Sequence, residues 1–347
     1  MKILLYIPIL TLFLLSCSLD IDEQGDMSSE LSDLSERINP TQAFEINPEK
    51  DTSIVGRLGT KIFIPANSLV FDNGEQATSK VTLKLKEVYS ISEMILNGLS
   101  TTSNGELLET SGMINLEAST DDRTLNLKSD SPVKIQFRNV TSAPFMRTYL
   151  GQVDSTGVNW QLDAKNVYDT IKFDQPTEYI VTLDYGADSV FSGTVTYGII
   201  GNDTIELTRT QFEGDFTTAD TIAYSYDPPF YEIHSTELNW INCDFFINSD
   251  DNIRVMVNKF DGANTLNFLI FQDYYSIMSS WESKENNSVF RNIPPGSIVT
   301  AIGIAKKDSD YYLAEQVVTL EEENQQITLD YKESTLEKIS NQLEELE

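Results

Sequence analysis

Hydrophobic and polar residues alternate along much of the chain, with the period of two that is typical of half-buried β-strands. In residues 80–86 this alternation places three aliphatic side chains on one face of a strand. Further strands are expected where β-branched and aromatic residues gather, at residues 57–65, 113–118, 133–137, 179–185, 190–197, 240–246, 253–257, 266–271 and 298–305. The pattern predicts an all-β fold of two or three antiparallel β-sandwich domains with a short C-terminal helix.

The C-terminal helix is predicted over residues 333–347, where apolar residues recur at intervals of three and four. These residues are Leu336, Ile339, Leu343 and Leu346. Ser334 and Glu337 have the form of a capping box at the start of the helix. The apolar stripe is expected to pack against the body of the protein rather than to form a coiled coil. Residues 91–96 form either a short helix or a covering loop.

Turn-forming residues divide the predicted strands into blocks. Asn73-Gly74 lies between residues 57–65 and 80–86 and predicts a hairpin turn. Asp227-Pro228-Pro229 marks a break near the end of a middle block. The expected organisation is a first β-sandwich domain at residues 43–139, a middle β domain at 140–235 and a C-terminal β-sandwich domain at 236–332.

The chain opens with a basic residue and an apolar run over residues 3–15, which Pro8 interrupts. This run is too short to cross a bilayer. The sequence Leu14-Leu15-Ser16-Cys17 resembles a bacterial lipobox, the motif that the lipoprotein signal peptidase recognises. The resemblance implies a signal peptide at residues 1–16 and an acylated Cys17 as the first residue of the mature protein. The alternatives are a transmembrane helix and an ordinary secretory signal.

Residues 17–42 are polar and acidic, and we expect them to form a tether. Asp20, Asp22 and Glu23, close behind the cysteine, resemble the export signal of surface lipoproteins of the Bacteroidetes. The resemblance implies anchoring in the outer membrane through acyl chains, with the protein exposed on the cell surface. The alternative is a plain acidic linker, which would leave the protein on the periplasmic face.

The net charge and the cysteine content exclude some classes of partner and disulfide bonding. The chain has 54 acidic and 24 basic residues, a net charge of -30, so nucleic acid and anionic membrane surfaces would repel it. It has two cysteines, and acylation of Cys17 would leave Cys243 without a disulfide partner. Cys243 lies in an apolar run and is expected to be a buried small hydrophobic residue.

Two resemblances concern the sandwich domains. The run from Gly59 to Ser68, followed by the predicted hairpin, resembles the opening of a ZU5-type domain. It departs from that family at Asn67-Ser68, where a small Gly-Ala pair would follow the proline. The resemblance implies a non-catalytic module that binds proteins. Residues 289–305, an apolar strand, a Pro-Pro-Gly turn and an alternating strand, resemble the carboxypeptidase-regulatory or transthyretin-like sandwich, although any antiparallel sandwich needs such turns.

Catalytic and metal-binding motifs are missing from the sequence. His234 is the only histidine, and there is no Gly-x-Ser-x-Gly elbow, His-Glu-x-x-His, Cys-x-x-Cys or phosphate-binding loop. We therefore expect no enzyme, no cofactor and no metal site. A hydrolase that uses two carboxylates on a carbohydrate is the alternative, since 54 acidic residues are available. Residues 248–252 offer oxygen ligands for calcium, but a hairpin turn explains them equally.

Two groups of residues are candidates for contact with glycans, one for binding a sugar and one for carrying an attached sugar. Tyr274, Tyr275 and Trp281 lie near polar loops and are candidates for a sugar-stacking surface, whereas the alternative is ordinary core packing. Five Asp-Ser/Thr tripeptides resemble the O-glycosylation acceptors of Bacteroidetes, although an aspartate before a strand is also a common turn residue. Their hydroxyl residues are Ser155, Thr170, Ser189, Thr204 and Thr221.

These observations predict a lipid-anchored surface protein that acts by non-catalytic binding or scaffolding of a protein or glycan partner at the outer membrane. A structural subunit of an envelope assembly is the second interpretation. The carbohydrate hydrolase is the third.

Overall fold

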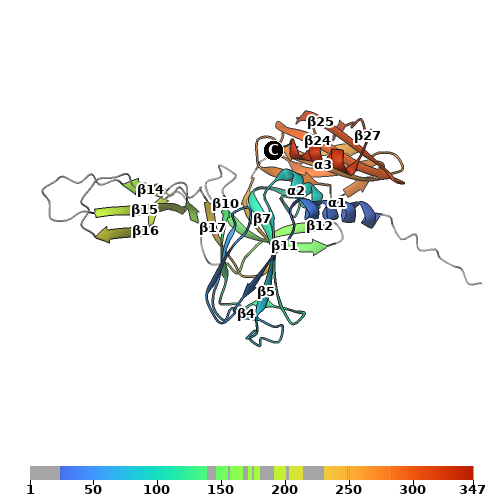
Figure 1. Cartoon of the computed structure of the whole chain (residues 1–347). Coiled ribbons are helices and arrows are strands. Elements are labelled where there is room, and N and C mark those ends of the chain that lie inside the picture. Colours follow the sequence, from blue (N-terminus) through green and yellow to red (C-terminus); the bar gives the residue numbers. More distant parts are fainter. Residues whose placement is uncertain are drawn as a thin grey trace, which may run out of the picture.

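The computed structural model describes the backbone of residues 24–138, 146–154, 157–166, 171–173, 176–179, 191–200, 203–213, 230–247, 249, 251–280 and 282–346. Side chains are described for the same residues except 24–26, 154 and 171–213. The fold is all-β with a short C-terminal helix, as the sequence predicts (Figure 1). Two β-sandwiches are joined through a layer of helices.

The first sandwich contains two facing antiparallel sheets. The first sheet has the order β1 (Gln42–Ile46), β5 (Val81–Val88), β7 (Glu106–Thr120), β18 (Asn239–Phe246), β11 (Arg147–Asp154) and β12 (Gly157–Leu162), with β6 (Thr102–Ser103) and β8 (Arg123–Thr124) paired to β7. The second sheet has the order β2 (Thr52–Val55), β3 (Lys61–Ile64), β10 (Val133–Arg138), β17 (Phe230–Ser235), β13 (Ile171–Phe173), β15 (Phe191–Ile200) and β14 (Pro176–Tyr179), with β16 (Asp203–Glu213) paired to β15. A small pair, β4 (Leu69–Val70) and β9 (Asn126–Leu127), lies beside them.

Alternation of apolar residues explains the core between these sheets. Val81, Leu83 and Leu85 of β5 are fully or almost fully buried, and they share one core with Ile62 of β3 and Ile135 of β10. The residues between them on β5 and β10 face outward because successive side chains of a strand point to opposite faces. The predicted strand at residues 80–86 is therefore confirmed.

The C-terminal sandwich also has two sheets. One has the order β22 (Glu282–Lys284), β23 (Asn287–Ile293), β19 (Ile253–Asn258) and β26 (Gln325–Ile327). The other has the order β21 (Ser276–Ser279), β20 (Asn264–Phe271), β24 (Ser297–Lys307), β25 (Asp310–Leu320) and β27 (Lys332–Ser334). Val257, Phe290, Leu269 and Ala301 are buried in the core between them.

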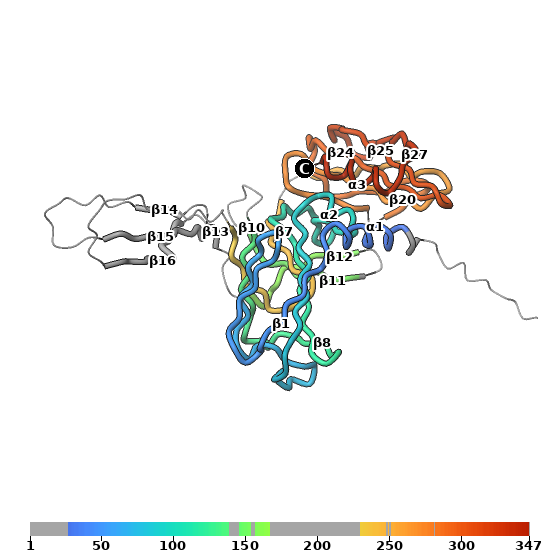
Figure 2. The backbone as a smooth tube through the Cα atoms, in the orientation of Figure 1, coloured from blue at the N-terminus to red at the C-terminus, as the bar shows by residue number. Residues whose placement is uncertain are grey.

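A helix layer lies between the two sandwiches (Figures 1 and 2). It consists of α1 (Gln24–Ile38), α2 (Ile91–Leu96) and α3 (Leu336–Glu344). Ile339 and Leu343 of α3 are fully buried there, so the predicted packing of the C-terminal stripe is confirmed. The cap differs by one residue: the hydroxyl of Thr335, not Ser334, accepts from the amide of Lys338, because Ser334 still belongs to β27.

The predicted tether at residues 17–42 needs correction, because residues 24–38 of it form α1. Met27 and Leu31, one turn apart on α1, are buried in the helix layer. The segment is too polar to fold alone, but it buries these two side chains against apolar surfaces that both sandwiches supply.

The predicted domain borders also differ from the strand pairing. The expected borders place β11, β12 and β17 in a middle domain and β18 in the C-terminal domain, yet all four strands complete the first sandwich. β17 pairs with β10, and β18 pairs with β7, from Asn239↔Leu116 to Phe246↔Leu108. The first sandwich is therefore discontinuous in sequence, which strand periodicity alone does not reveal.

Two predicted turns exist. Asn73-Gly74 forms a tight turn in which the amide of Gly74 donates to Phe71, and Gly74 has the positive φ of +81° that favours glycine. Val70 and Gln76 on either side of the turn form an antiparallel bridge, so the predicted hairpin turn is confirmed. The longer strands β3 and β5 belong to opposite sheets of the sandwich and do not pair with each other. The turn at residues 294–296 likewise connects β23 to β24 in the facing sheet.

β7 connects the three cores. Leu107 is buried in the C-terminal sandwich, Leu108 and Met113 in the helix layer, and Ile114 and Leu116 in the first sandwich. A shift in register opposite Asn242 and Asp244 of β18 accompanies the change from one core to the next.

Candidate functional site

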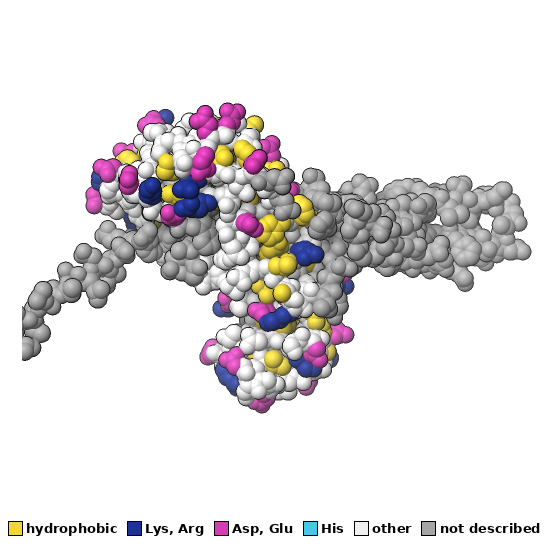
Figure 3. All heavy atoms as spheres, turned by 180° about the vertical axis from the view of Figure 1, so that it is seen from behind, with side chains coloured by type: hydrophobic (Ala, Val, Ile, Leu, Met, Phe, Trp, Pro, Cys, Tyr) yellow, Lys and Arg dark blue, Asp and Glu magenta, His cyan; other side chains and the backbone are white. Residues whose placement is uncertain are grey.

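A hollow of about 590 Å³ lies on the outer face of the second sheet. Phe63, Lys134 and His234 line it, with Asp51 and Asp130 among the other lining residues. Figure 3 views the molecule from behind, and on that face apolar side chains follow the first sandwich beside both acidic and basic ones.

Strand register explains why these residues meet. Ser53 of β2 lies opposite Phe63 of β3, Phe63 lies opposite Lys134 of β10, and Lys134 lies opposite His234 of β17. We call these four residues the outer row, since they cross four strands on the face away from the core. A parallel row of Val55, Lys61, Gln136 and Glu232 follows two residues further along the strands.

Contacts hold the outer row in place. The ammonium of Lys134 lies 4.4 Å from the centre of the Phe63 ring and 3.5 Å from a carboxylate oxygen of Glu232. Gln136 donates a 2.8 Å hydrogen bond to the same oxygen of Glu232. Lys134 therefore presents a cation over an aromatic ring, a geometry that suits a ligand with both polar and apolar groups.

The backbone of His234 contributes to the fold, and its imidazole lines the hollow. Its backbone carbonyl accepts hydrogen bonds from the hydroxyl of Thr148 at 2.7 Å and the amide of Asn166 at 2.6 Å, which connects β17 to the first sheet. Burial lowers the pKa of the imidazole, with Glu232 acting in the opposite direction and Lys134 lowering it further. The imidazole is therefore neutral at physiological pH, and its Nδ1 atom is buried in the protein while the residue lines the hollow.

The two carboxylates of the hollow lie on loops. Asp51 precedes β2 and accepts from the amide of Ala66 at 2.8 Å. Asp130 precedes β10 and is 3.3 Å from the ammonium of Lys128, which lowers the pKa of Asp130. The lowered pKa keeps Asp130 ionised at neutral pH, whereas the general acid of a glycosidase is a carboxyl group that remains protonated.

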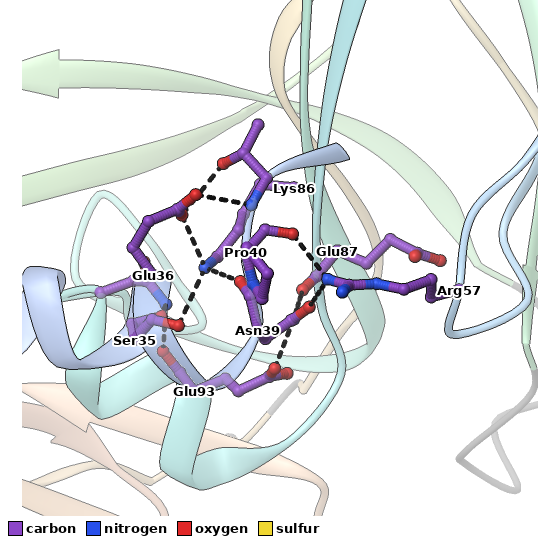
Figure 4. Close-up of polar contacts among 10 residues, drawn as sticks. Ser35, Glu36, Asn39, Pro40, Arg57, Lys86, Glu87 and Glu93 are labelled. Carbon is purple, nitrogen blue, oxygen red and sulfur yellow. Dashed lines mark hydrogen bonds and ion pairs between the residues drawn. The ribbon is translucent and has the colours of Figure 1, made fainter. Parts of the chain in front are cut away.

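A second cluster of charged residues lies where α1 joins the first sandwich (Figure 4). Lys86 of β5 lies 3.3 Å from Glu36 of α1 and donates to the carbonyls of Ser35 and Asn39. The amide of Asn39 donates to the backbone of Glu87 at 2.7 Å and to the carboxylate of Glu93 at 2.5 Å.

Glu87 is the centre of this cluster and is fully buried. Its carboxylate accepts from the amides of Leu58 and Thr60, each at 3.0 Å, and from the side chain of Gln42 at 2.8 Å. A Cβ atom on Gly56 would lie 2.4 Å from this carboxylate, so only glycine fits there. We call the buried residues Asn39, Lys86, Glu87 and Glu93, together with the exposed Glu36 that pairs with Lys86, the buried junction, which fixes α1 to the sandwich.

A third polar group, Asp244 of β18, is buried where the first sheet meets the helix layer. Burial raises the pKa of Asp244 well above its ordinary value, and Glu109 raises it further, whereas hydrogen bonds with Thr110 and Asn242 lower it. Asn242 donates to Oδ2 of Asp244 at 2.5 Å, but none of the described residues donates to Oδ1. The site is closed to solvent and has no access for a substrate.

Tyr274 and Tyr275, the two aromatic candidates that the structure describes, pack against different cores. The hydroxyl of Tyr275 donates a 2.5 Å hydrogen bond to the carbonyl of Tyr89, and the ring packs in the helix layer. Tyr274 packs against the C-terminal core, and Trp281 lies outside the described residues. Tyr275 therefore connects the two sandwiches rather than facing a sugar, which corrects that part of the expectation.

Most of the other candidate residues lie outside the described part of the chain. These are Cys17, Asp20, Asp22, Glu23, Ser155, Thr170, Ser189 and Thr221, together with Asn248 and Asp250 of the calcium candidate. Thr204 lies on β16 opposite Ile199. Cys243 is fully buried in the first core and burial raises the pKa of its thiol, so the prediction for this residue is confirmed.

Sequence reasoning missed Phe63 and Lys134. Both lie in predicted strands, at outward positions of the alternation, but the sequence does not say which strands are neighbours. In the described part of the chain no group of three or more His, Cys, Asp or Glu residues is placed to hold a metal ion.

Comparison with family models, with curated proteins and with solved structures finds no match for this chain. Within the described residues, no helix combines the length and the hydropathy needed to cross a membrane.

Proposed function

We propose that this protein is a lipid-anchored surface protein that binds a protein or glycan partner without catalysis, through the outer row. The observation that carries the proposal is the alignment of Phe63, Lys134 and His234 across three neighbouring strands in an open hollow. An aromatic ring, a cation and a neutral imidazole in one line recognise an extended partner by stacking and hydrogen bonds.

The geometry of the hollow supports binding over hydrolysis. Its two carboxylates are on loops at Asp51 and Asp130, and each already interacts with a neighbour, Asp51 with the amide of Ala66 and Asp130 with Lys128. Burial keeps the imidazole of His234 neutral, and Lys134 also lowers its pKa. These groups form a recognition surface with fixed charges, which is the feature a binding module needs.

The anchoring part of the proposal rests on the lipobox-like sequence that ends at Cys17. Acylation of this residue would place the membrane only a few residues before α1, whose C-terminal end is fixed to the first sandwich by the buried junction. The protein body would then stay close to the membrane. Cys17→Ala is expected to release the protein from the membrane fraction, and retention of this variant would contradict lipidation.

Surface exposure has its own test. Protease added to intact cells is expected to cut the wild-type protein, because the acidic residues Asp20, Asp22 and Glu23 are proposed to direct it outward. Complete resistance in intact cells, with cleavage after lysis, would place the protein on the periplasmic face.

Binding through the outer row is tested by site-specific photo-crosslinking on intact cells. A photoreactive residue at position 134 is expected to capture a partner, whereas the same residue at position 84 is not, because Lys84 is exposed on the opposite sheet. Treatment of the captured product with protease and with glycosidases identifies the partner as protein or glycan. Equal capture at both positions, or none at 134, would contradict the proposal.

O-glycosylation at Ser155, Thr170, Ser189, Thr204 or Thr221 remains a proposal that rests on the Asp-Ser/Thr tripeptides. An intact mass above that of the acylated polypeptide is expected for protein purified from its own host. A mass equal to the acylated polypeptide would exclude all five sites.

A further inference from the structure

We propose that the partner is a protein segment in extended conformation, which binds along β2 as an additional strand of the second sheet. The inference rests on the proposed function and goes beyond it, because it names the class of partner and the backbone groups that hold it.

β2 is the last strand of the second sheet and pairs only with β3 among the described strands. The amide of Gly56 donates to the carbonyl of Thr60, and the register places Ile54 opposite Ile62. Hydrogen-bonded pairs alternate along an antiparallel ladder, so Ile54 and Thr52 direct their backbone groups toward β3. Ser53 and Val55 therefore direct their amides and carbonyls toward the free edge.

The free edge is capped beyond Val55 but not along β2 itself. The side chain of Gln42 accepts from the amide of Arg57 at 2.9 Å. At the start of β2, Asp51 accepts from the amide of Ala66 at 2.8 Å, but Ala66 follows β3, so this bond lies on the paired side of β2. Among the described residues, none forms a hydrogen bond with the backbone of Ser53 or Val55 outside the ladder, so the four backbone groups of these two residues remain available for a strand.

β2 also has none of the usual devices that prevent edge pairing. Proteins protect exposed edges with charged residues, proline or bulges, yet β2 has the sequence Thr-Ser-Ile-Val and regular pairing. By contrast, the edge strand β12 is tied to the turn between β6 and β7, because the side chain of Asn159 accepts from the backbone amide of Asn104 at 2.8 Å. Val55 is 55% exposed, so it is an apolar contact for a strand that pairs with β2.

The neighbouring rows define the side chains of the partner. A residue opposite Ser53 would lie on the same face as the outer row, with the small side chain of Ser53 between it and Phe63. A residue two positions away would lie beside Val55. The expected partner segment thus has two apolar residues separated by one residue, and main-chain hydrogen bonds supply the rest of its affinity.

A second copy of this chain fits the edge less well. Each copy has a net charge of -30, and two rigid bodies joined by one four-residue strand would bury much less than the roughly 1,200 Å² of a specific interface. A short flexible segment avoids the charge repulsion between two copies. It also needs no rigid-body contact beyond the strand, because it adapts to the edge.

The experiment uses the full mature chain and a synthetic peptide of alternating threonine and valine with a lysine at each end. Hydrogen exchange at Ser53 and Val55 is expected to slow at least tenfold when the peptide is in excess. A control peptide with proline in place of the central valines is expected to have no effect, because proline cannot donate to the ladder.

Two variants separate backbone pairing from side-chain contact. Ser53→Pro is expected to weaken peptide binding at least tenfold and to leave the β2–β3 pairing intact, because this amide points away from β3. Ser53→Thr is expected to bind like the wild type. Absence of protection at Ser53 and Val55, or equal binding by Ser53→Pro, would overturn the inference.

The experiments distinguish failure of the strand inference from failure of the proposed function. Capture of a glycan at position 134, with no peptide protection at β2, would overturn the strand inference alone. Concentration-dependent dimerisation that Ser53→Pro abolishes would overturn it in favour of a second copy. No capture at position 134 would contradict the proposed function itself.

Discussion

The buried junction and the outer row both hold charged side chains on the first sandwich, but they differ in how fully those charges are satisfied. In the junction, the carboxylate of Glu87 accepts three hydrogen bonds and is completely enclosed. In the outer row, Lys134 contacts one ring and one carboxylate while more than a third of its side chain remains exposed.

This difference separates a structural role from a binding role. A buried charge is tolerated only where neighbours replace the hydrogen bonds of water, which leaves it no capacity for a ligand. A half-exposed charge keeps that capacity. The following predictions test the comparison through stability, from the largest expected change to the smallest.

Glu87→Ala is expected to reduce the free energy of unfolding by about 3–5 kcal/mol, because it leaves the amides of Leu58 and Thr60 buried without an acceptor. Urea denaturation measures the change. Glu117→Ala, on the exposed face of β7, is the matched control and should change stability by less than about 0.5 kcal/mol. Similar values for both variants would mean that the junction does not stabilise the fold.

Leu343→Ala is expected to cost about 2–5 kcal/mol, because it opens a cavity in the helix layer where this side chain is fully buried. Thermal denaturation measures the loss, with the exposed Gln342→Ala as the neighbouring control. An unchanged melting temperature, together with an unchanged oligomeric state, would show that α3 does not pack.

Asp244→Asn is expected to stabilise the protein by about 1–3 kcal/mol at pH 8, because it removes a buried acid that would have to ionise. A carboxyl group with a raised pKa contributes its full stability below its unfolded pKa and loses it as the pH rises through the folded value. The advantage of the variant should therefore shrink at pH 5. An advantage that grows toward acid would contradict this assignment.

His234→Gln is expected to change the acid side of the stability profile by no more than about 1 kcal/mol. Burial lowers the pKa of His234, so the unfolded chain binds a proton more readily than the folded protein. The wild type should lose stability as the pH falls from 7 through the lowered folded value, and the variant should lose less. Identical profiles between pH 7 and 5 would show that the imidazole titrates as in the unfolded chain.

Lys134→Ala is expected to alter stability by less than about 0.5 kcal/mol, because its ion pair is partly exposed and screened. Lys86→Ala provides the contrast, since Lys86 is buried and donates to two backbone carbonyls. Parallel urea titrations compare the two lysines. A loss at position 134 as large as that at position 86 would remove the distinction between the junction and the outer row.

Strand periodicity predicts much of the local structure and little of the topology. The alternation at 80–86, the run around Cys243 and the helical stripe at Leu343 are properties of neighbouring residues, and the structure confirms each of them. The partners of these strands depend on packing between distant segments. Hence the sequence predicts the hairpin turn at Asn73-Gly74, which the bridge between Val70 and Gln76 confirms, but it does not show that β3 and β5 lie in opposite sheets.

The outer row illustrates the same limit at the candidate site. Phe63, Lys134 and His234 come from three segments, and their alignment depends on the registers Lys134↔Phe63 and Lys134↔His234. A single sequence contains no record of these registers. The helix α1 was missed for a related reason, because its few apolar residues suffice only when two sandwiches cover Met27 and Leu31.

The discontinuous first sandwich has a consequence for the order in which the chain folds during synthesis. β7 and β10 are made early, but their partners β18 and β17 come after the whole middle block. Until residue 246 has been added, the apolar edges of both sheets lack a neighbour, a state that invites aggregation. Contacts between such distant segments also form slowly. The nascent chain is therefore expected to require a chaperone until β18 has been made.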